Sequence, residues 1–519
     1  MKVASGIPSQ RSTQSSVLAS QFSSFPALNI LLLLVIFNFA LQPLREPDFG
    51  WHLRTGLDVL HNGWKLPTVD PYSHTMPEWA WVEHAWLTDV LIGGIYSLFG
   101  GLGIIVLFGA VTVGAWLLAS RVARCGIVFQ WLACILSLWV ALPYLGARTQ
   151  LITLLGLALL MLMLKRWQTG EVSVRWWIPP LFLFWANLHG GFPAGLFLLG
   201  LIIITTLFVR WLAAYPIPFM RQPDEPLFSW WDLKQLMFIL VLSSLMTLVN
   251  PYGWRLHSEI FDSLSNRFML DTLQEWQPIS INGVAGRSYT LYLIGLGLGI
   301  VLWYRRIEPV RWVVGGLFLA LSLRHMRNIP FFLIISLPLC AELLAHGFEW
   351  LQNWVPFGQL VRKRGSFAGA LAVGAILIWL GSEHLQHVIQ SGARPAEYFR
   401  ETSYPIEAVE WVKTHRELVG KRLYNDYTYG GFLLWWLPED KIFIDGRMPT
   451  WQTGESRIFR DYVALTDVDP PDLTLLKKYS VDWAMVRKQT FLDQALAHES
   501  AWTKVYEDRK VAIYRLLSG

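Results

Sequence analysis

Long apolar blocks separated by short polar segments occupy the chain up to about Ser382. A bilayer core about 30 Å thick needs about 20 helical residues to cross it, and fewer where the bilayer thins. The pattern therefore predicts a polytopic α-helical membrane protein with about eleven transmembrane helices. The predicted ranges are residues 26–43, 101–120, 127–144, 149–165, 177–189, 191–209, 235–250, 289–304, 311–323, 329–345 and 368–383.

From residue 384 onward, strand patterns alternate with helix patterns, as in a soluble domain. This alternation predicts a C-terminal α/β domain that spans residues 384–519. The predicted helices are Glu407–Val419, Asp472–Tyr479 and Phe491–Ala497, and Gly430–Leu437 follows a Gly-Gly turn. The predicted strands are Lys421–Tyr424, Lys441–Asp445, Trp483–Val486 and Val511–Leu516.

Three segments complete the predicted organisation. Residues 1–25 are polar and rich in Ser and Gln, which predicts a disordered N-terminus. The transmembrane domain covers residues 26–383, and its first span is expected to be an uncleaved helix. A large first outer loop covers residues 44–100, and it contains the apolar segment Trp86–Phe99. That segment is short for a span, so we expect it to lie in the membrane interface.

Composition and charge agree with the membrane interpretation. The chain is 53% hydrophobic and 16% charged, against roughly a quarter charged in soluble domains. The three cysteines lie in or beside apolar blocks, which disfavours a disulfide framework and a cysteine metal site. The basic residues of the membrane part lie in short loops between spans, so they indicate topology and not a nucleic-acid partner.

The distribution of charge predicts the sidedness of the protein. If the N-terminus is cytoplasmic, the inner segments hold 16 basic and 6 acidic residues, and the outer loops hold 9 basic and 11 acidic residues. This asymmetry follows the positive-inside rule. It places the C-terminal domain outside the cytoplasm, because eleven crossings end opposite the start.

Polar and ionisable clusters fall mostly at the outer ends of the predicted spans. Such residues are costly at membrane ends unless they are paired or functional. Clusters that converge on one face resemble a site, whereas each cluster alone resembles a helix cap. The clusters are Pro47–His52, Glu83–Trp86, Ala147–Gln150, Asn187–Gly191, Asn250–Trp254 and Arg324–Asn328.

Asp48 and His52 are four residues apart, so one helical turn would place both on the same face. Asp48 is a candidate general base, because a carboxylate can accept a proton from an acceptor hydroxyl. An equally good interpretation is that Asp48 caps a juxtamembrane helix. Glu83 and His84, together with His52, form a candidate divalent-metal site with mixed oxygen and nitrogen ligands. Hydrogen-bonded interface residues are the more common outcome for such a group without a metal-binding motif.

Several other polar residues have two interpretations. His189 is either a ligand or a residue that satisfies a carbonyl at a helix end. Arg148, Arg324 and Arg327 either bind a lipid phosphate, which suits the planar fork of arginine, or reach toward lipid headgroups. Asp445 and Arg447 of the C-terminal domain either bind substrate or, as is more common, stabilise a turn.

Five motifs resemble a bacterial group of polytopic membrane proteins that are similar to the GT-C superfamily of glycosyltransferases. They are PDxxWHxxTG (Pro47–Gly56), WANLHGGF (Trp185–Phe192), NPYG (Asn250–Gly253), RNIPxF (Arg327–Phe332) and FIDGR (Phe443–Arg447). An acidic residue just after the first span, here Asp48, and the stretch Trp86–Gly100 resemble the first outer loop of GT-C enzymes. The loop has no Asp-x-Asp or Glu-Asp pair, so the resemblance leaves the metal open.

The resemblance implies a membrane glycosyltransferase at the outer face of the bacterial cytoplasmic membrane. Its partners would be membrane lipid, a polyprenyl-phosphate sugar donor and a glycan, lipid or protein acceptor. A transporter or a non-enzymatic scaffold for envelope assembly are the alternatives. The expected catalytic residues are Asp48 and Glu83, the expected substrate-binding residues are Trp51, Arg148, His189, Arg324 and Arg327, and the expected metal ligands are His52 and His84.

Overall fold

The computed structural model of the protein describes residues 26–213, 228–354, 381–454 and 456–517. The predicted disordered N-terminus and most of the predicted last span, 368–383, lie outside the described residues. The same holds for some of the basic residues that indicate sidedness, which are Lys2, Arg11, Arg221, Arg362, Lys363 and Arg364.

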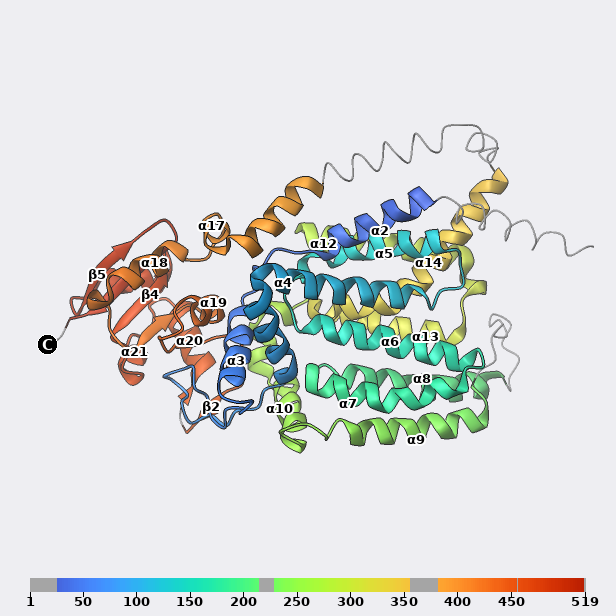
Figure 1. Cartoon of the computed structure of the whole chain (residues 1–519), viewed down its shortest axis with the longest axis horizontal. Helices are drawn as coiled ribbons and strands as arrows, with labels where there is room; N and C mark the ends of the chain where they lie inside the picture. Colours follow the sequence, from blue (N-terminus) through green and yellow to red (C-terminus); the bar gives the residue numbers. More distant parts are fainter. Residues whose placement is uncertain (1–25, 214–227, 355–380, 455, 518–519) are drawn as a thin grey trace, which may run out of the picture.

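A bundle of apolar helices forms the larger part of the molecule (Figure 1). Every predicted span that lies within the described residues is helical. Its helices are α2 (Pro26–Ala40), the second half of α4 (Trp86–Ser120), α5 (Ile127–Ala141), α6 (Gln150–Gln168), α7 (Ile178–Leu188), α8 (Pro193–Ala213), α9 (Trp230–Met246), α12 (Val284–Trp303), α13 (Pro309–Arg324) and α14 (Ile329–Trp354). Short 3-10 helices lie at Leu142–Tyr144, Val172–Trp177, Gln274–Trp276, Tyr304–Arg306 and Met326–Asn328.

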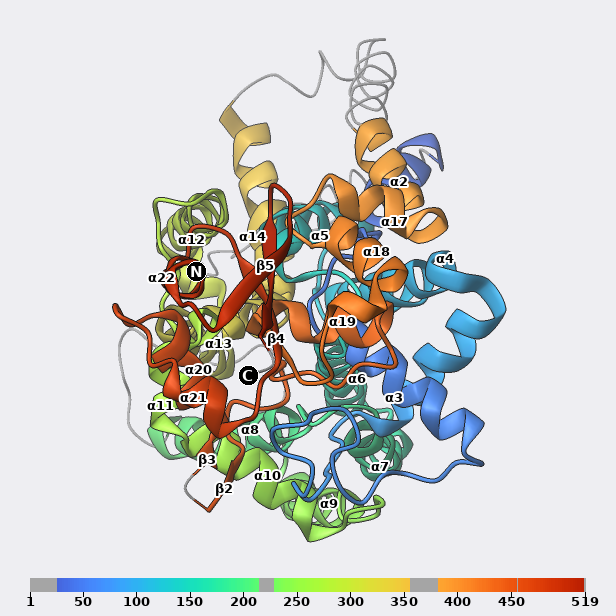
Figure 2. The same ribbon diagram turned by 90° about the vertical axis from the view of Figure 1, so that its left-hand side faces the viewer.

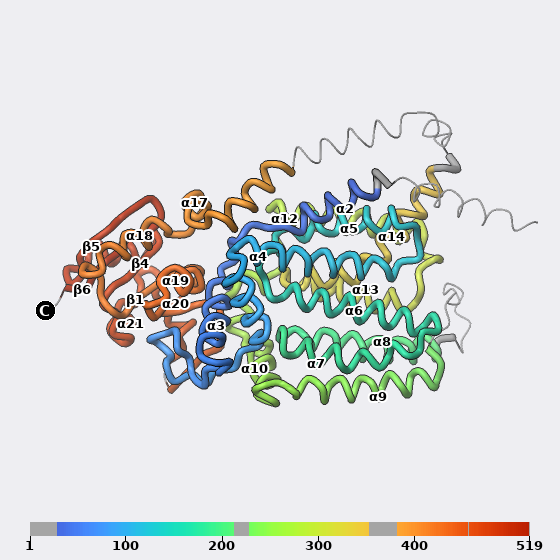
Figure 3. Tube along the Cα trace, viewed as in Figure 1, coloured from blue at the N-terminus to red at the C-terminus, as the bar shows by residue number. Residues whose placement is uncertain are grey.

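Among the described residues, 6 helices are long and apolar enough to cross a membrane, and this identifies a multi-pass membrane protein. The predicted number of eleven is not established, because helices such as α7 have only 11 residues. At about 1.5 Å per residue, such a helix is shorter than the bilayer core. The chain trace in Figure 3 runs back and forth along the bundle, so alternate loops gather at opposite ends.

Helix α4 contains a sharp change of direction at Gly100, whose φ of 61° and ψ of −157° are not helical. A glycine is suited to this position because its lack of a Cβ removes the penalty for positive φ. Figure 1 shows the first half of α4 beside α3 (Phe49–His61), across the end of the bundle, and the second half along the bundle. The separation of Trp86–Phe99 from the span 101–120, predicted from the sequence, is therefore confirmed.

Two further helices at the same end were not predicted from the sequence. They are α10 (Trp254–Ser265) and α11 (Arg267–Thr272), in the segment between α9 and α12. Helix α10 is amphipathic, and its apolar side chains Trp254 and Phe261 are 71% and 70% exposed. Exposed aromatic side chains on a short amphipathic helix are typical of a membrane interface.

The C-terminal domain contains a four-stranded sheet in the order β1-β4-β6-β5. Strand β1 (Leu423–Asn425) is parallel to β4 (Trp483–Arg487), and β6 (Val511–Leu516) is antiparallel to both β4 and β5 (Trp502–Glu507). A small hairpin joins β2 (Gln452–Thr453) to β3 (Ser456–Arg457). The helices are α17 (Pro395–Arg400), α18 (Ile406–Thr414), α19 (Gly430–Trp436), α20 (Ile458–Thr466), α21 (Thr474–Lys478) and α22 (Phe491–His498), with 3-10 turns at Arg416–Leu418 and Tyr427–Tyr429.

The predicted strand Lys441–Asp445 is wrong. The segment is extended and buried, but it does not join the sheet, and its single bridge pairs Ile442 with Ser73 of the first outer loop. An apolar run bounded by turn residues looks the same in sequence whether it enters a sheet or packs beneath it. Strand β5, helix α20 and the β2–β3 hairpin were not predicted.

The first outer loop packs into the core of the C-terminal domain. One apolar cluster fills the helix bundle, and a second fills the domain. Trp51, Tyr72, Met76 and Trp81 of the loop belong to the second cluster. The loop and the domain therefore form one packed body at one end of the bundle (Figures 1 and 2).

Candidate active site

Helices α3 and α4 cross at two glycines, and this crossing positions the candidate site. A Cβ on Gly56 would lie 1.8 Å from the backbone oxygen of Asp89, and a Cβ on Gly93 would lie 2.7 Å from the carbonyl carbon of Gly56. Only glycine permits such an approach of the two backbones. The crossing brings His52, one turn before Gly56, against Asp89 of α4.

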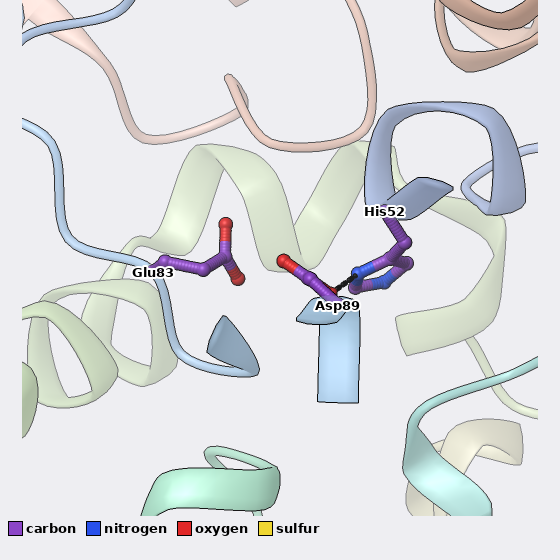
Figure 4. Close-up of side chains that lie close together, drawn as sticks. All are labelled: His52, Glu83 and Asp89. Atoms are coloured by element: carbon purple, nitrogen blue, oxygen red, sulfur yellow. Dashed lines mark hydrogen bonds and ion pairs between the residues drawn. The ribbon is translucent and has the colours of Figure 1, made fainter. Parts of the chain in front are cut away.

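His52, Glu83 and Asp89 form a buried group at this crossing (Figure 4). His52 Nδ1 lies 2.6 Å from Asp89 Oδ1. One nitrogen or oxygen atom of each of the three residues lies within 4.8 Å of the others. The second oxygen of Asp89 is buried and has no hydrogen-bond partner among the described residues. An unpartnered buried carboxylate oxygen is costly, so this Asp89 oxygen is suited to bind a cation.

The electrostatics of this group fit a cation ligand set. Burial lowers the pKa of His52 to about 3, so its imidazole is neutral at physiological pH. Burial also raises the pKa of Glu83 well above its usual range. The raised pKa favours a protonated carboxyl at Glu83, and a bound cation would favour loss of that proton. A neutral imidazole and two carboxylates are then the ligand types that zinc and manganese accept.

Two more histidines continue from His52 in a row of rings. The His84 ring lies 6.4 Å from His52 and 5.8 Å from His189, between ring centroids. His189 Nδ1 accepts a hydrogen bond from Gly191 N at 3.0 Å and lies 2.7 Å from Thr153 Oγ1. Because Nδ1 accepts, the proton of neutral His189 is on Nε2. The sequence placed His84 with His52 as a metal ligand, whereas the structure groups His52 with Asp89 and Glu83.

Asp48 occupies the N-cap position of α3, but its side chain does not cap the helix. The capping interpretation of Asp48 is therefore wrong. Burial, followed by the charge of Glu46, raises the pKa of the Asp48 carboxyl to about 6. The backbone N–H of His52 donates to the backbone oxygen of Asp48 at 3.3 Å, which is the hydrogen bond of one helical turn. The two side chains therefore share a face of α3, as the spacing predicted. On the domain side, a Cβ on Gly446 would lie 2.1 Å from Asp48 Oδ1.

Two of the three predicted phosphate-binding arginines form ion pairs with glutamates whose charges act on Asp48. Arg148 forms an ion pair with Glu46, and Arg327 forms one with Glu275. Both of those glutamates raise the pKa of Asp48. Arg324 is exposed at the end of α13. Its position suits contact with lipid headgroups better than contact with a site around Asp48.

Arg447 connects the C-terminal domain to the first outer loop. Its Nη1 donates to Asp70 Oδ1 at 2.9 Å, and its Nε donates to Asp445 Oδ2 at 2.8 Å. Its Nη2 lies 2.7 Å from the same Asp445 oxygen as an ion pair. The guanidinium also lies 5.2 Å from the centre of the Tyr72 ring and 5.1 Å from that of Trp81. Asp445 Oδ1 accepts from Arg447 N, so the predicted turn is confirmed. The side chains of Arg447, Asp70 and Asp445 are buried, and their contacts join the C-terminal domain to the first outer loop.

Sequence reasoning missed four acidic residues of this region, which are Glu46, Asp70, Asp89 and Glu275. Asp89 gave a signal, because it interrupts an otherwise apolar stretch. An acidic residue inside an apolar helix is expected to face a partner or a site. The motif clusters do converge, since Trp86 Nε1 donates to Asn187 Oδ1 at 2.9 Å and Gln150 Nε2 donates to Arg327 O at 3.3 Å.

No protein-family model matches the chain, and no curated protein matches its sequence. The fold is similar to that of the oligosaccharyltransferase AglB from Archaeoglobus fulgidus, solved with an inhibitory peptide and a dolichol-phosphate (12% identity, 90% of this chain, 70% of that chain, TM-score 0.52). It is also similar to ArnT from Cupriavidus metallidurans bound to undecaprenyl phosphate (13% identity, 94% and 97% coverage, TM-score 0.52). Apo ArnT matches with 15% identity, 97% and 98% coverage and a TM-score of 0.51. The expected GT-C-like fold is confirmed.

Proposed function

We propose that this protein transfers a sugar from a polyprenyl-phosphate donor to an acceptor hydroxyl at the outer face of the membrane, with Asp48 as the general base. The observation that carries the proposal is the position of Asp48. It lies at the bundle end covered by the C-terminal domain, and its pKa is raised to about 6. The fold supports the proposal, because it is shared with proteins solved with dolichol-phosphate and with undecaprenyl phosphate.

The raised pKa suits a general base. A base works best when its pKa lies near the working pH, because it is then mostly deprotonated and still basic enough to accept a proton. In the proposed reaction, the acceptor oxygen forms a bond to the anomeric carbon, and the bond between that carbon and the phosphate oxygen breaks. The acceptor proton goes to Asp48, and the lipid phosphate leaves with the electron pair.

Arg148 and Arg327 are the proposed partners of the departing phosphate. Each arginine has five N–H donors, and one ion pair to a glutamate leaves others for a phosphate oxygen. Arginine forks recognise phosphate in a bidentate manner, and stabilisation of developing negative charge favours bond breakage. Trp51 stacks on His52 with ring centroids 3.5 Å apart, and this contact fixes the orientation of the His52 imidazole.

A divalent cation would be held by His52, Glu83 and Asp89, with the row through His84 and His189 beside it. When bound, such a cation would supply Lewis-acid stabilisation of negative charge on the phosphate. The protein's own contribution is to hold the ligands rigidly at the α3–α4 crossing. The assignment of His52 and Asp89 as ligands rests on their distances and on the unpartnered Asp89 oxygen.

The proposed location is the bacterial cytoplasmic membrane, with a cytoplasmic N-terminus and an extracytoplasmic C-terminal domain. The distribution of basic residues in the sequence supports this orientation. Reporter fusions after Arg166 and Arg306 should report a cytoplasmic location, and a fusion after Gly420 should report the outside. A cytoplasmic result for Gly420 would overturn the proposed location of the site.

The catalytic role is tested by Asp48→Asn in purified protein supplied with a polyprenyl-phosphate sugar. The amide keeps the size of the side chain but cannot accept the proton, so transfer should fall by about 10²-fold or more. Glu78→Gln is the matched control, since Glu78 is exposed in the same loop. The unfolding midpoint and the donor affinity of Asp48→Asn should stay close to those of the wild type. Undiminished transfer by Asp48→Asn would eliminate this residue as the base.

A further inference from the structure

A cleft of about 320 Å³ lies between the C-terminal domain and the segment that precedes Glu275. One wall is Thr272–Gln274 of the membrane part, and the other comes from α20, β1, the turn after β1, β4 and the start of α22. In Figure 2, α11 and α20 are neighbours on this face, and the Phe268 and Phe459 rings of these helices lie 5.8 Å apart. The volume is at the lower limit of the roughly 300–1,000 Å³ of small-molecule pockets.

The cleft adjoins the candidate site from two directions. Gln274 is followed directly by Glu275, the partner of Arg327. Tyr427 lines the cleft, and burial, then the charges of Asp48 and Glu275, raise its pKa well above the usual range. Tyr427 therefore belongs to the wall of the cleft and also lies within reach of the charges of Asp48 and Glu275, so the cleft and the candidate base are near each other.

The lining combines aromatic faces with carboxylates. Tyr427 lies 5.5 Å from Phe459 and 6.1 Å from Tyr462, between ring centroids. Asp467 is exposed at the end of α20, and Asp426 lies at the turn after β1. Aromatic faces carry partial negative charge and attract the C–H groups of a ring, and carboxylates accept strong hydrogen bonds from hydroxyls. These are the two requirements of a pyranose ring.

The charges of the lining disfavour an anionic ligand. Arg487 is the basic residue of the cleft wall, and it is already bound to Asp426 Oδ1 at 3.2 Å and to Thr428 Oγ1 at 2.8 Å. Asp426 and Asp467 leave the wall with an excess of negative charge. A phosphorylated or carboxylated ligand would be repelled, whereas a neutral polyhydroxylated ligand would not.

We propose that this cleft binds the acceptor, and that the acceptor is a neutral carbohydrate. The link between the cleft and transfer rests on the proposed function above. The binding of carbohydrate does not depend on Asp48, because Asp48 does not line the cleft.

The test uses the full-length protein in lipid nanodiscs free of sugar-based detergent. Saturation-transfer difference NMR is recorded with maltotriose, mannotriose and chitobiose, and with glucose 1-phosphate and a neutral Gly-Ser-Asn peptide for comparison. At least one neutral saccharide should bind, and the sugar phosphate and the peptide should not. Absence of saccharide binding to the wild type, or preference for the peptide or the phosphate, would overturn the proposal.

Two cleft variants and a control locate the binding. Asp467→Asn and Tyr462→Ala should each raise the Kd of the saccharide by on the order of fivefold, the loss expected for one carboxylate or one aromatic contact. Glu439→Gln, exposed elsewhere on the same domain, should leave the Kd unchanged. Binding that is unaffected by both cleft variants would also overturn the proposal.

Asp48→Asn separates this proposal from the function it rests on. The variant should bind saccharide as the wild type does and lose transfer. If it binds saccharide and still transfers sugar at full rate, the assignment of the base fails and the cleft assignment stands. If saccharide binding is absent while transfer depends on Asp48, the cleft assignment alone fails.

Discussion

The two ends of the helix bundle use charge in different ways. At the end covered by the C-terminal domain, His52, Glu83 and Asp89 are buried together, and Asp70 and Asp445 enclose Arg447. At the opposite end, the charges lie in loops and in helices α13 and α14, and they form pairs that are partly exposed. These pairs include Arg124 with Glu308 at 2.8 Å, Arg311 with Glu342 at 2.6 Å and Arg306 with Glu349 at 3.6 Å.

The difference shows what each kind of charge needs. The orientation of a membrane protein depends on how many basic residues each loop carries, so these residues can lie anywhere in the loop. Surface pairs contribute little to stability. Buried charges need defined partners, because each one that loses its partner becomes costly. The covered end is therefore the end at which single substitutions should have large effects.

The largest effect on stability is expected for Arg447→Met. The variant leaves Asp70 and Asp445 buried without a cation, and breaking a buried pair in this way typically costs about 3–5 kcal/mol. We expect the C-terminal domain to detach from the first outer loop at lower denaturant concentration, measured by limited proteolysis of the full-length protein. Stability unchanged within about 0.5 kcal/mol would show that this network does not hold the two parts together.

A smaller effect is expected at the helix crossing. A Cβ at Gly56 would meet the Asp89 backbone at 1.8 Å, so Gly56→Ala must separate α3 from α4. Overpacking of this kind costs about 1–3 kcal/mol. Gly94→Ala is the matched control in α4, because no atom lies within 4 Å of its Cβ position. If both variants melt at the wild-type temperature, the close crossing is not required.

Removal of one candidate metal ligand is expected to weaken divalent-cation binding. His52→Ala should lower the affinity for Mn²⁺ or Zn²⁺ by at least about tenfold, a loss seen even for residues that only orient a ligand. Equilibrium dialysis of the full-length protein measures this, with His61→Ala, an exposed histidine at the end of the same helix, as the control. Equal affinity in the two variants would remove His52 from the ligand set.

The smallest effect is expected at the opposite end. Arg306 and Glu349 are about half exposed, at 51% and 45% for their side chains. Arg306→Met should therefore change the free energy of unfolding by less than about 1 kcal/mol. A loss as large as that of Arg447→Met would contradict the distinction between the two ends.

Much of the fold follows from patterns that are local in the sequence. The apolar blocks predicted the helices of the bundle, and the glycines and Asp89 separated Trp86–Phe99 from the following span. The α/β character of the C-terminal domain followed from its alternating patterns. Strand β5 was missed, and Lys441–Asp445 was wrongly predicted as a strand, because strand pairing depends on segments far away in the chain.

The candidate site could be predicted only in part. Asp48, His52 and Glu83 stood in one polar loop, so their proximity could be expected. Asp89 joins them through a hydrogen bond across 37 residues, and that contact exists because Gly56 lets two helices touch. Likewise, the partner of Arg447 in the first outer loop is 377 residues away. A single sequence gives no measure of such contacts.

The central claim, that Asp48 is a base with a raised pKa, is tested most directly by the pH dependence of transfer. Its pKa of about 6 predicts that kcat/KM is half-maximal near that pH and is lost as the pH falls further, because the protonated carboxyl cannot accept a proton. The contribution of Asp48 to stability has the opposite sign. A carboxyl with a raised folded-state pKa binds more protons when folded, so it stabilises the protein more as the pH falls.

Acid unfolding and titration of the base can thus be distinguished in one experiment, in which transfer and the unfolding midpoint are followed together from about pH 4.5 to 8. The account predicts an acidic limb near pH 6 in the wild type. It also predicts that the residual transfer of Asp48→Asn lacks this limb. A value of kcat/KM that stays constant between about pH 5 and 7 in the wild type, with the protein folded throughout, would contradict it.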